Sequence, residues 1–178
     1  MSLKFGVLGL LNYGSMTGYD INLFFNRSLA FFWKAQTCQI YRELKNLEGE
    51  GYVMCEEIVQ YDKPNKKIFH ITETGRTALV EWLNENCSLS DVRNTFLLKL
   101  FLSGFQDKER TIEQLKGYIS EADDLLHKIE KVEDTYAYAA PGAESHFPYW
   151  TAVKDFGVMY EKMCIEWAEQ IIALLEKM

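Results

Sequence analysis

Four segments between residues 18 and 75 decide the fold: Gly18-Tyr19-Asp20-Ile21, Gln39-Ile40-Tyr41-Arg42-Glu43-Leu44, Glu50-Gly51-Tyr52-Val53 and Thr72-Glu73-Thr74-Gly75. In this order they predict a helix, a turn, a second helix and a two-stranded hairpin. That succession is typical of a winged helix-turn-helix domain, whose second helix enters the major groove of DNA. The fold expected for the whole chain is mostly α with a small β-wing, and a helical, coiled-coil-like dimerisation domain follows the winged domain.

The helix expected from Thr37 to about Glu50 is the candidate DNA-reading element. Ile40, Leu44 and Leu47 recur at steps of four and three residues, which predicts a narrow buried stripe. The other positions carry donor-rich side chains of the kind that read base edges and grip phosphates. They are Gln39, Arg42, Lys45 and Asn46, with Cys38 beside them and Tyr41 at the flank. Taken alone, they also fit the solvated face of an ordinary surface helix.

A β-hairpin is expected after that helix. Gly51 is suited to end the helix, and residues 52–61 and 67–72 are rich in β-branched and aromatic side chains. The segment between them contains Pro64 and Asn65, which favour a turn. Lys63, Lys66 and Lys67 are expected to put three positive charges at the hairpin tip, where they suit backbone phosphates.

Further helices are expected around these elements. Leu3 to Leu11 is apolar enough for a buried helix, and Thr17 and Thr72 are placed to cap the helices that follow them. The aromatic run at 31–33 is expected to cover the core. The helix beginning at Glu73 is expected to bury one face, made of Ala78, Leu79, Trp82 and Leu83.

The second half of the chain is expected to be helical. We place the domain boundary near residues 86–90, which gives a DNA-binding domain at 1–86 and a dimerisation or effector domain at 87–178. Residues 96–102 are apolar on nearly every side. Two longer segments show alternating steps of three and four, typical of a coiled coil. These positions are Ile112, Leu115, Ile119, Ala122, Leu126 and Ile129, then Phe156, Tyr160, Met163, Trp167, Ile171 and Leu174. The rhythm fits packing within one chain or between two, and a twofold dimer is the common solution.

The composition is that of a globular protein. Of the 178 residues, 48% are hydrophobic and 25% are charged, a balance that argues against disorder. The net charge is −7, with nine basic and ten acidic residues in 1–86 and ten and sixteen in 87–178. A DNA-binding domain usually presents a positively charged surface. Since residues 1–86 have no excess of basic residues, such a surface must come from a local cluster of lysines here.

The cysteine pattern and the chain start favour a cytoplasmic protein. None of the four cysteines is spaced as C-x-x-C, and the first residues do not form a signal peptide. No apolar run is long enough to span a bilayer. No cofactor is indicated, and the three histidines have no metal-ligand spacing.

The motifs resemble the PadR family of bacterial transcriptional regulators. Besides the four segments above, the resemblance includes Phe32-Trp33, Leu47-Glu48 and Ile71 to Arg76, and it covers about residues 3–83. It implies a dimeric winged-helix repressor on inverted-repeat operators, with Gln39, Tyr41 and Arg42 at the DNA-facing start of the recognition helix and Lys66 and Lys67 on the wing. Family members often carry Pro where this chain has Arg42, which implies a different local contact. Their effectors include phenolic acids and other aromatic or cationic molecules.

Three other hypotheses stay open beside operator binding. Aromatic side chains of the second half are candidates to bind a small aromatic effector, although ordinary packing would also explain them. These are Phe96, Phe101, Trp150 and Trp167. Cys38, near Arg42 and Lys45, is a candidate redox switch. A winged-helix module that binds protein rather than DNA is the alternative function. No motif of an enzyme active site occurs in the sequence.

Overall fold

The computed structural model describes residues 2–29, 31–59, 61, 65–87, 93–132 and 144–178. These residues form two compact units. The first contains the described residues up to Cys87 together with 144–146, and the second contains 93–132 and 147–178. The functional division into domains 1–86 and 87–178 stays a prediction, and each unit is described by itself.

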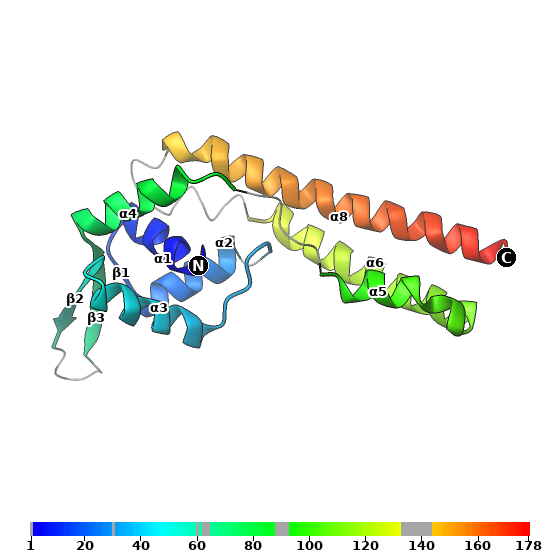
Figure 1. Cartoon of the computed structure of the whole chain (residues 1–178), viewed down its shortest axis with the longest axis horizontal. Helices are drawn as coiled ribbons and strands as arrows, with labels where there is room; N and C mark the ends of the chain where they lie inside the picture. The colour runs from blue at the N-terminus through cyan, green and yellow to red at the C-terminus, as the bar shows by residue number, and fades with distance from the viewer. Residues whose placement is uncertain (1, 30, 60, 62–64, 88–92, 133–143) are drawn as a thin grey trace. The chain divides into compact units, whose positions relative to one another are not determined.

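The described residues of the first unit form four α-helices around one apolar core (Figure 1). They are α1 (Ser2–Tyr13), α2 (Gly18–Ser28), α3 (Thr37–Gly49) and α4 (Glu73–Leu83), and a short 3-10 helix η2 (Glu144–His146) belongs to the same unit. The stripe expected on α3 is confirmed, because Ile40, Leu44 and Leu47 are fully buried. They join Val7, Leu8, Leu11, Ile21, Phe25, Val53, Phe69 and Leu79 in the core.

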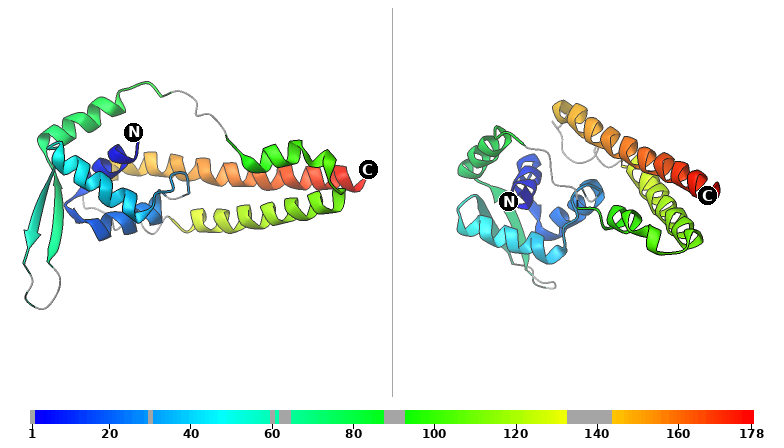
Figure 2. Two further views of the ribbon diagram at one scale, coloured as in Figure 1. Left: turned by 60° about the horizontal axis from the view of Figure 1, so that its bottom comes forward. Right: turned by 45° about the vertical axis from the view of Figure 1, so that its right-hand side comes forward.

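The sheet of the first unit has three strands rather than the two expected. Strands β2 (Val53–Ile58) and β3 (Lys66–Ile71) form the hairpin, and the two-residue β1 (Met16–Thr17) pairs with the other edge of β3. All pairs are antiparallel, and Figure 2 shows the hairpin reaching beyond the helices of its unit. A strand as short as β1 leaves no periodic pattern, so the sequence gives no sign of it.

The helix ends follow the residues expected to make them. The Thr17 side chain accepts from the Asp20 backbone N–H at 3.1 Å, and the Asp20 carboxylate accepts from the Thr17 backbone N–H at 3.2 Å. Thr72 caps α4 in the same way, accepting from Gly75. Gly51 ends α3 with φ of 74°, a left-handed conformation that glycine adopts without strain. The Tyr52 N–H donates to the Leu47 carbonyl there at 2.9 Å.

The second unit is an antiparallel pair of long helices with a shorter helix beside them (Figure 1). Its elements are α5 (Thr95–Phe101), the 3-10 helix η1 (Ser103–Phe105), α6 (Lys108–Glu130) and α8 (Phe147–Glu176). On α6 the expected seam is largely confirmed, since Leu115, Ala122, Leu126 and Ile129 are buried while Ile112 and Ile119 are half-buried.

The seam on α8 differs from the expected one by a single residue position. The residues buried along α8 are Gly157, Glu161, Cys164 and Ala168, with Lys154 before them. Each of these four follows directly after an expected position, which rotates the seam by about 100°. Gly157 and Ala168 are small, so α6 can approach there, whereas bulky Phe156 is left 65% exposed.

Two smaller predictions of buried residues are wrong for the single chain. Leu83, expected on the buried face of α4, is 65% exposed, and Phe32 and Trp33 are exposed rather than covering the core. Trp82 instead packs parallel to the Phe5 ring, with 4.7 Å between ring centroids. No helix among the described residues is both long and apolar enough to cross a membrane.

Candidate nucleic-acid interface

Helix α3 presents a polar face opposite its buried stripe. The side chains of Arg42, Lys45 and Asn46 on it are exposed, and so is Cys38 near its start. The stripe fixes this orientation, because residues three and four apart lie on the same side of a helix. The structure therefore puts one guanidinium, one ammonium and one amide on a single accessible surface, the donor set suited to base edges and phosphates.

Gln39 has a structural role that was not predicted. Its side-chain oxygen accepts from the Gln36 backbone N–H at 2.8 Å, which completes a capping box at the start of α3. The amide oxygen is thus occupied, and the Nε2 group is the part able to donate to DNA. The signal was available, because a Gln three residues after a polar N-cap is the pattern of a capping box.

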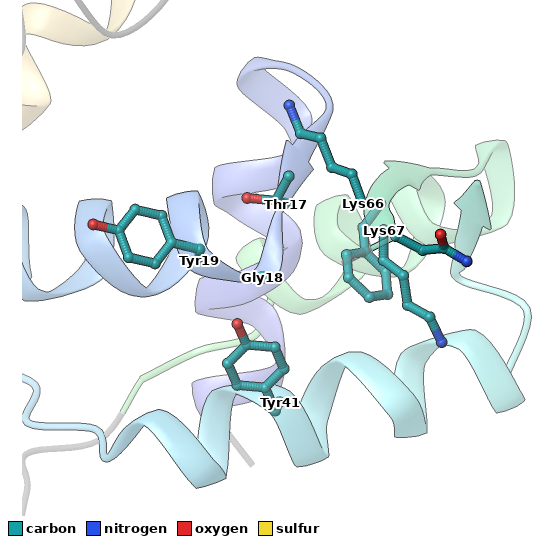
Figure 3. A pocket seen from close by; sticks show the side chains of 8 residues that line it. Thr17, Gly18, Tyr19, Tyr41, Lys66 and Lys67 are labelled. Atoms are coloured by element: carbon teal, nitrogen blue, oxygen red, sulfur yellow. The ribbon is translucent and has the colours of Figure 1, made fainter. Parts of the chain in front are cut away.

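Tyr41 stands over the start of α2. Its ring is 46% exposed, and Figure 3 shows it rising from α3 toward Gly18. The two residues are so close that a Cβ built on Gly18 would lie 2.5 Å from Tyr41 Cε1. The recognition helix and the helix before it therefore meet through an aromatic ring set against a glycine.

The wing lysines lie on a strand and not at the hairpin tip. Lys66 and Lys67 are the first two residues of β3, opposite Ile58 and Glu57 of β2. Both are exposed, and they leave the strand in opposite directions (Figure 3). Among the residues that the structure describes, no carboxylate makes an ion pair with either lysine. Lys63 lies outside the described residues.

An open pocket joins the recognition helix to the wing. It is lined by Thr17, Gly18, Tyr19, Tyr41, Asn65, Lys66, Lys67 and Phe69 (Figure 3). These residues come from β1, from the start of α2, from α3, and from β3 with the residue before it. Of its polar lining groups, the Tyr41 hydroxyl points toward Gly18, the Tyr19 hydroxyl points away from Tyr41, and the two lysine side chains diverge (Figure 3). A tyrosine hydroxyl and an ammonium group are donors suited to an anion.

The candidate effector residues do not form one site. Phe96 and Trp167 come together with ring centroids 6.4 Å apart, and Tyr118 stacks on Phe96 at 4.3 Å. Tyr118 was missed because its position on α6 falls outside the apolar rhythm. Phe101 is 85% exposed, and Trp150 packs against Phe147 instead. Burial, together with a hydrogen bond to Cys164, raises the pKa of the Tyr118 hydroxyl and keeps it neutral.

The histidines and cysteines have local structural contacts. His70 on β3 lies between Ser15 and Glu56, with Nδ1 2.6 Å from the Ser15 hydroxyl and Nε2 3.1 Å from the carboxylate. This chain of contacts ties the loop before β1 to β2 and β3. The Cys38 thiol faces the Gln36 side-chain oxygen at 3.6 Å. In the described part of the chain, no three His, Cys, Asp or Glu residues are arranged to hold a metal ion.

Comparisons with known proteins agree on one family. A model of the transcriptional regulator PadR-like family matches residues 7–81, and one described as virulence activator alpha C-term matches residues 92–176. The negative transcriptional regulator PadR of Bacillus subtilis is 29% identical, over 98% of both chains.

Solved structures extend the similarity to the whole fold. The crystal structure of Bacillus subtilis PadR in complex with operator DNA has a TM-score of 0.83 and 27% identity, over 98% of this chain and 99% of that one. The same protein has been solved with p-coumaric acid, at a TM-score of 0.78 and 25% identity, over 99% of both chains. The Vibrio cholerae virulence activator AphA has a TM-score of 0.76 and is 30% identical over 98% of each chain.

The two family models fall one in each half of the chain, and a relative 30% identical is matched along nearly its whole length. The winged helix-turn-helix architecture agrees with both findings. This chain belongs to the PadR-like family of transcriptional regulators.

Proposed function

We propose that this regulator binds an inverted-repeat operator as a homodimer and represses transcription from it. The observations that carry the proposal are the exposed polar face of α3 and the two exposed lysines on the wing strand β3 of the same unit. Arg42, Lys45 and Asn46 would enter the major groove, while Lys66 and Lys67 would contact the backbone. Bacillus subtilis PadR, solved with operator DNA, supports this use of the fold.

The acidic net charge does not oppose this proposal. Two wing lysines free of ion pairs among the described residues, with Arg42 and Lys45, form a local basic surface within a chain of net charge −7. Because the Debye length at physiological salt is about 8 Å, an exposed phosphate responds mainly to charges close to it. The excess of acidic residues belongs to 87–178 and not to the part of the chain that carries α3 and the wing.

Homodimer formation would cover apolar surface that one chain leaves in water. On α8, Phe156, Met159 and Met163 are 65%, 71% and 52% exposed, and Leu98 and Phe101 of α5 are 61% and 85% exposed. Several large apolar side chains left exposed on one helix are typical of an interface. Helix α6 already covers the neighbouring face of α8. A second copy of the same chain is therefore the expected partner for the exposed face.

A small aromatic effector is the third part of the proposal. Bacillus subtilis PadR has been solved with p-coumaric acid, which motivates a planar phenolic ligand. The cluster of Phe96, Tyr118 and Trp167 offers aromatic faces for it. Titration with phenolic acids should then quench the intrinsic tryptophan fluorescence of the wild type and leave a Trp167→Phe variant less affected. A flat fluorescence signal across the acids would remove the cluster from the proposal.

The test of the proposal is fluorescence anisotropy with a labelled duplex from the promoter beside the protein's own gene. We expect tight binding that resists random competitor DNA and weakens steeply with salt. Lys66→Ala and Lys67→Ala should each reduce the salt slope by about one and weaken binding to all sequences alike. Lys162→Ala on α8 removes the same charge from the second unit and should leave the slope unchanged.

A winged-helix module that binds protein instead of DNA is the second candidate. The acidic second half of the chain favours it. In that case the labelled duplex would show no binding beyond that of random DNA, although the protein is a dimer. Unchanged salt slopes in both lysine variants would remove the wing from the DNA-binding mechanism.

A further inference from the structure

A close approach between α2 and α3 involves a residue with no side chain. A Cβ on Gly18 would lie 2.5 Å from Cε1, 3.0 Å from Cζ and 3.2 Å from the hydroxyl oxygen of Tyr41. Real Cβ atoms do not approach other atoms as closely as the first of these distances, so any side chain at position 18 would displace the ring. Gly18 therefore provides the hollow that seats the outer part of the tyrosine ring (Figure 3).

The seated ring lines the open pocket between recognition helix and wing. Tyr41 is 46% exposed there, and Lys66 and Lys67 line the same pocket from β3. Within the described residues both ammonium groups lack a carboxylate partner at ion-pair distance. A hydroxyl donor and a lysine ammonium group at one opening suit a phosphodiester group, since charged hydrogen bonds are the strong ones. A neutral base edge would leave the cations unpaired.

We propose that this pocket holds one backbone phosphate of the operator, and that Gly18 is a positioning residue that acts through Tyr41. The inference rests on the proposed function and deepens it. Tyr41 then contacts the DNA backbone rather than reading sequence, unlike Arg42 one residue later. Gly18 makes no contact with DNA in this arrangement. Its role is to leave room for the Tyr41 ring, which places the hydroxyl at the pocket.

The experiment is a double-mutant cycle between positions 18 and 41 in the full-length protein. Affinities for the operator duplex and for a random duplex are measured for the wild type, Gly18→Ala, Tyr41→Ala and the double variant. Gly18→Ala and Tyr41→Ala should each weaken binding by roughly tenfold, about the loss expected for one hydrogen bond to a charged group. The double variant should be no weaker than Tyr41→Ala, because once the ring is gone a Cβ at position 18 displaces nothing.

Two further readouts separate positioning from general damage to the fold. The loss in each variant should be equal on operator and random duplex, so that the specificity ratio is kept. Gly49→Ala is the matched control within α3, since a Cβ there meets nothing within 4 Å, and it should bind like the wild type. If Gly18→Ala does not fold, as judged by circular dichroism, Tyr41→Phe carries the test, because it keeps the ring and should lose the same affinity as Tyr41→Ala.

The outcomes distinguish this inference from the proposed function. Losses that multiply in the double variant, a loss confined to the operator, or wild-type affinity in Tyr41→Phe would each overturn the inference while operator binding stood. A wild type that binds no duplex would overturn the proposed function and this inference with it. If the losses of affinity do not multiply in the double variant and are equal on the operator and random duplexes, they would support the inference and the proposed function together.

Discussion

Gly75, near the start of α4, shows how one residue can fix the position of a whole element. A Cβ at this position would collide with the Tyr52 carbonyl oxygen and lie 3.0 Å from Cγ1 of Ile71. The same carbonyl accepts from the Thr72 backbone N–H at 3.0 Å. The α4 helix can therefore begin against the end of the hairpin only because the residue there lacks a side chain.

This close approach predicts a loss of stability in Gly75→Ala. We expect the free energy of unfolding to fall by about 1–3 kcal/mol, the range for overpacking a well-packed site. Chemical denaturation monitored by circular dichroism measures it, with Gly49→Ala as the control, since its Cβ meets nothing within 4 Å. Equal stability of the two variants would contradict the tight contact.

Arg42 is the residue that we expect to recognise bases of the operator. It is exposed on α3 one position after Tyr41. Replacement by Ala should weaken operator binding by about 1–3 kcal/mol and affect random DNA less, because a base contact is specific. Competition anisotropy on both duplexes measures the difference. An equal loss on both would make Arg42 a phosphate contact instead.

Single residues also show how far sequence alone reaches. The helix caps at Thr17, Gly51 and Thr72 follow local rules of three or four residues, and all three were predictable. The burial of a residue such as Leu83 depends on partners distant in sequence, and the local pattern misjudged it. The same holds for Tyr118, which meets Phe96 and Trp167 only through tertiary packing.

At the scale of elements, the α6–α8 seam contains an acidic group. Glu161 is buried on α8, and burial raises the pKa of its carboxyl. The folded state then holds this proton more tightly than the unfolded chain does. The contribution of Glu161 to stability is therefore most favourable below the ordinary Glu pKa and is lost as pH rises through the folded pKa.

This sign predicts a pH-dependent effect of Glu161→Gln. The variant should have a higher melting temperature than the wild type at pH 7, and the difference should shrink as the pH falls toward about 4.3. Thermal melts at matched protein concentration measure it. Glu169→Gln, on an exposed position of the same helix, should show little difference at any pH. A constant difference for Glu161→Gln across the range would contradict the burial of a charged carboxylate.

The seam also explains why α8 was harder to predict than α6. On α6 the large apolar residues themselves form the seam, so their rhythm indicates the buried face. On α8 the seam uses Gly157, Cys164 and Ala168, whose small size carries little hydrophobic signal. The large apolar residues lie on the neighbouring face of α8, and their spacing of three and four residues therefore predicted the wrong buried face. A sequence pattern finds apolar faces but not which partner covers each one.

At the scale of the whole molecule, that neighbouring face of α8 is the proposed dimer interface. Charged substitutions at its centre, Phe156→Glu combined with Met163→Glu, should convert the protein from a dimer to a monomer, because burying two unpaired carboxylates is costly. Size-exclusion chromatography with light scattering measures the mass. Lys162→Glu, on a third face of α8 by helical periodicity, is the control and should leave the mass unchanged. A double variant that remains dimeric would move the interface elsewhere.

The proposed dimer also requires that its two recognition helices meet the same side of the duplex. For such a dimer the half-site centres lie about 34–36 Å apart, which is one turn of B-DNA or 10–10.5 base pairs. Inserting about five base pairs between the half-sites turns one of them to the opposite side of the duplex.

The most direct measurement is therefore the affinity of the wild type for its operator and for the same operator with that half-turn insertion, by fluorescence anisotropy. The account predicts that the insertion lowers the affinity to near that of random DNA. Equal affinities for the two duplexes would contradict it, because each chain would then be binding its half-site independently.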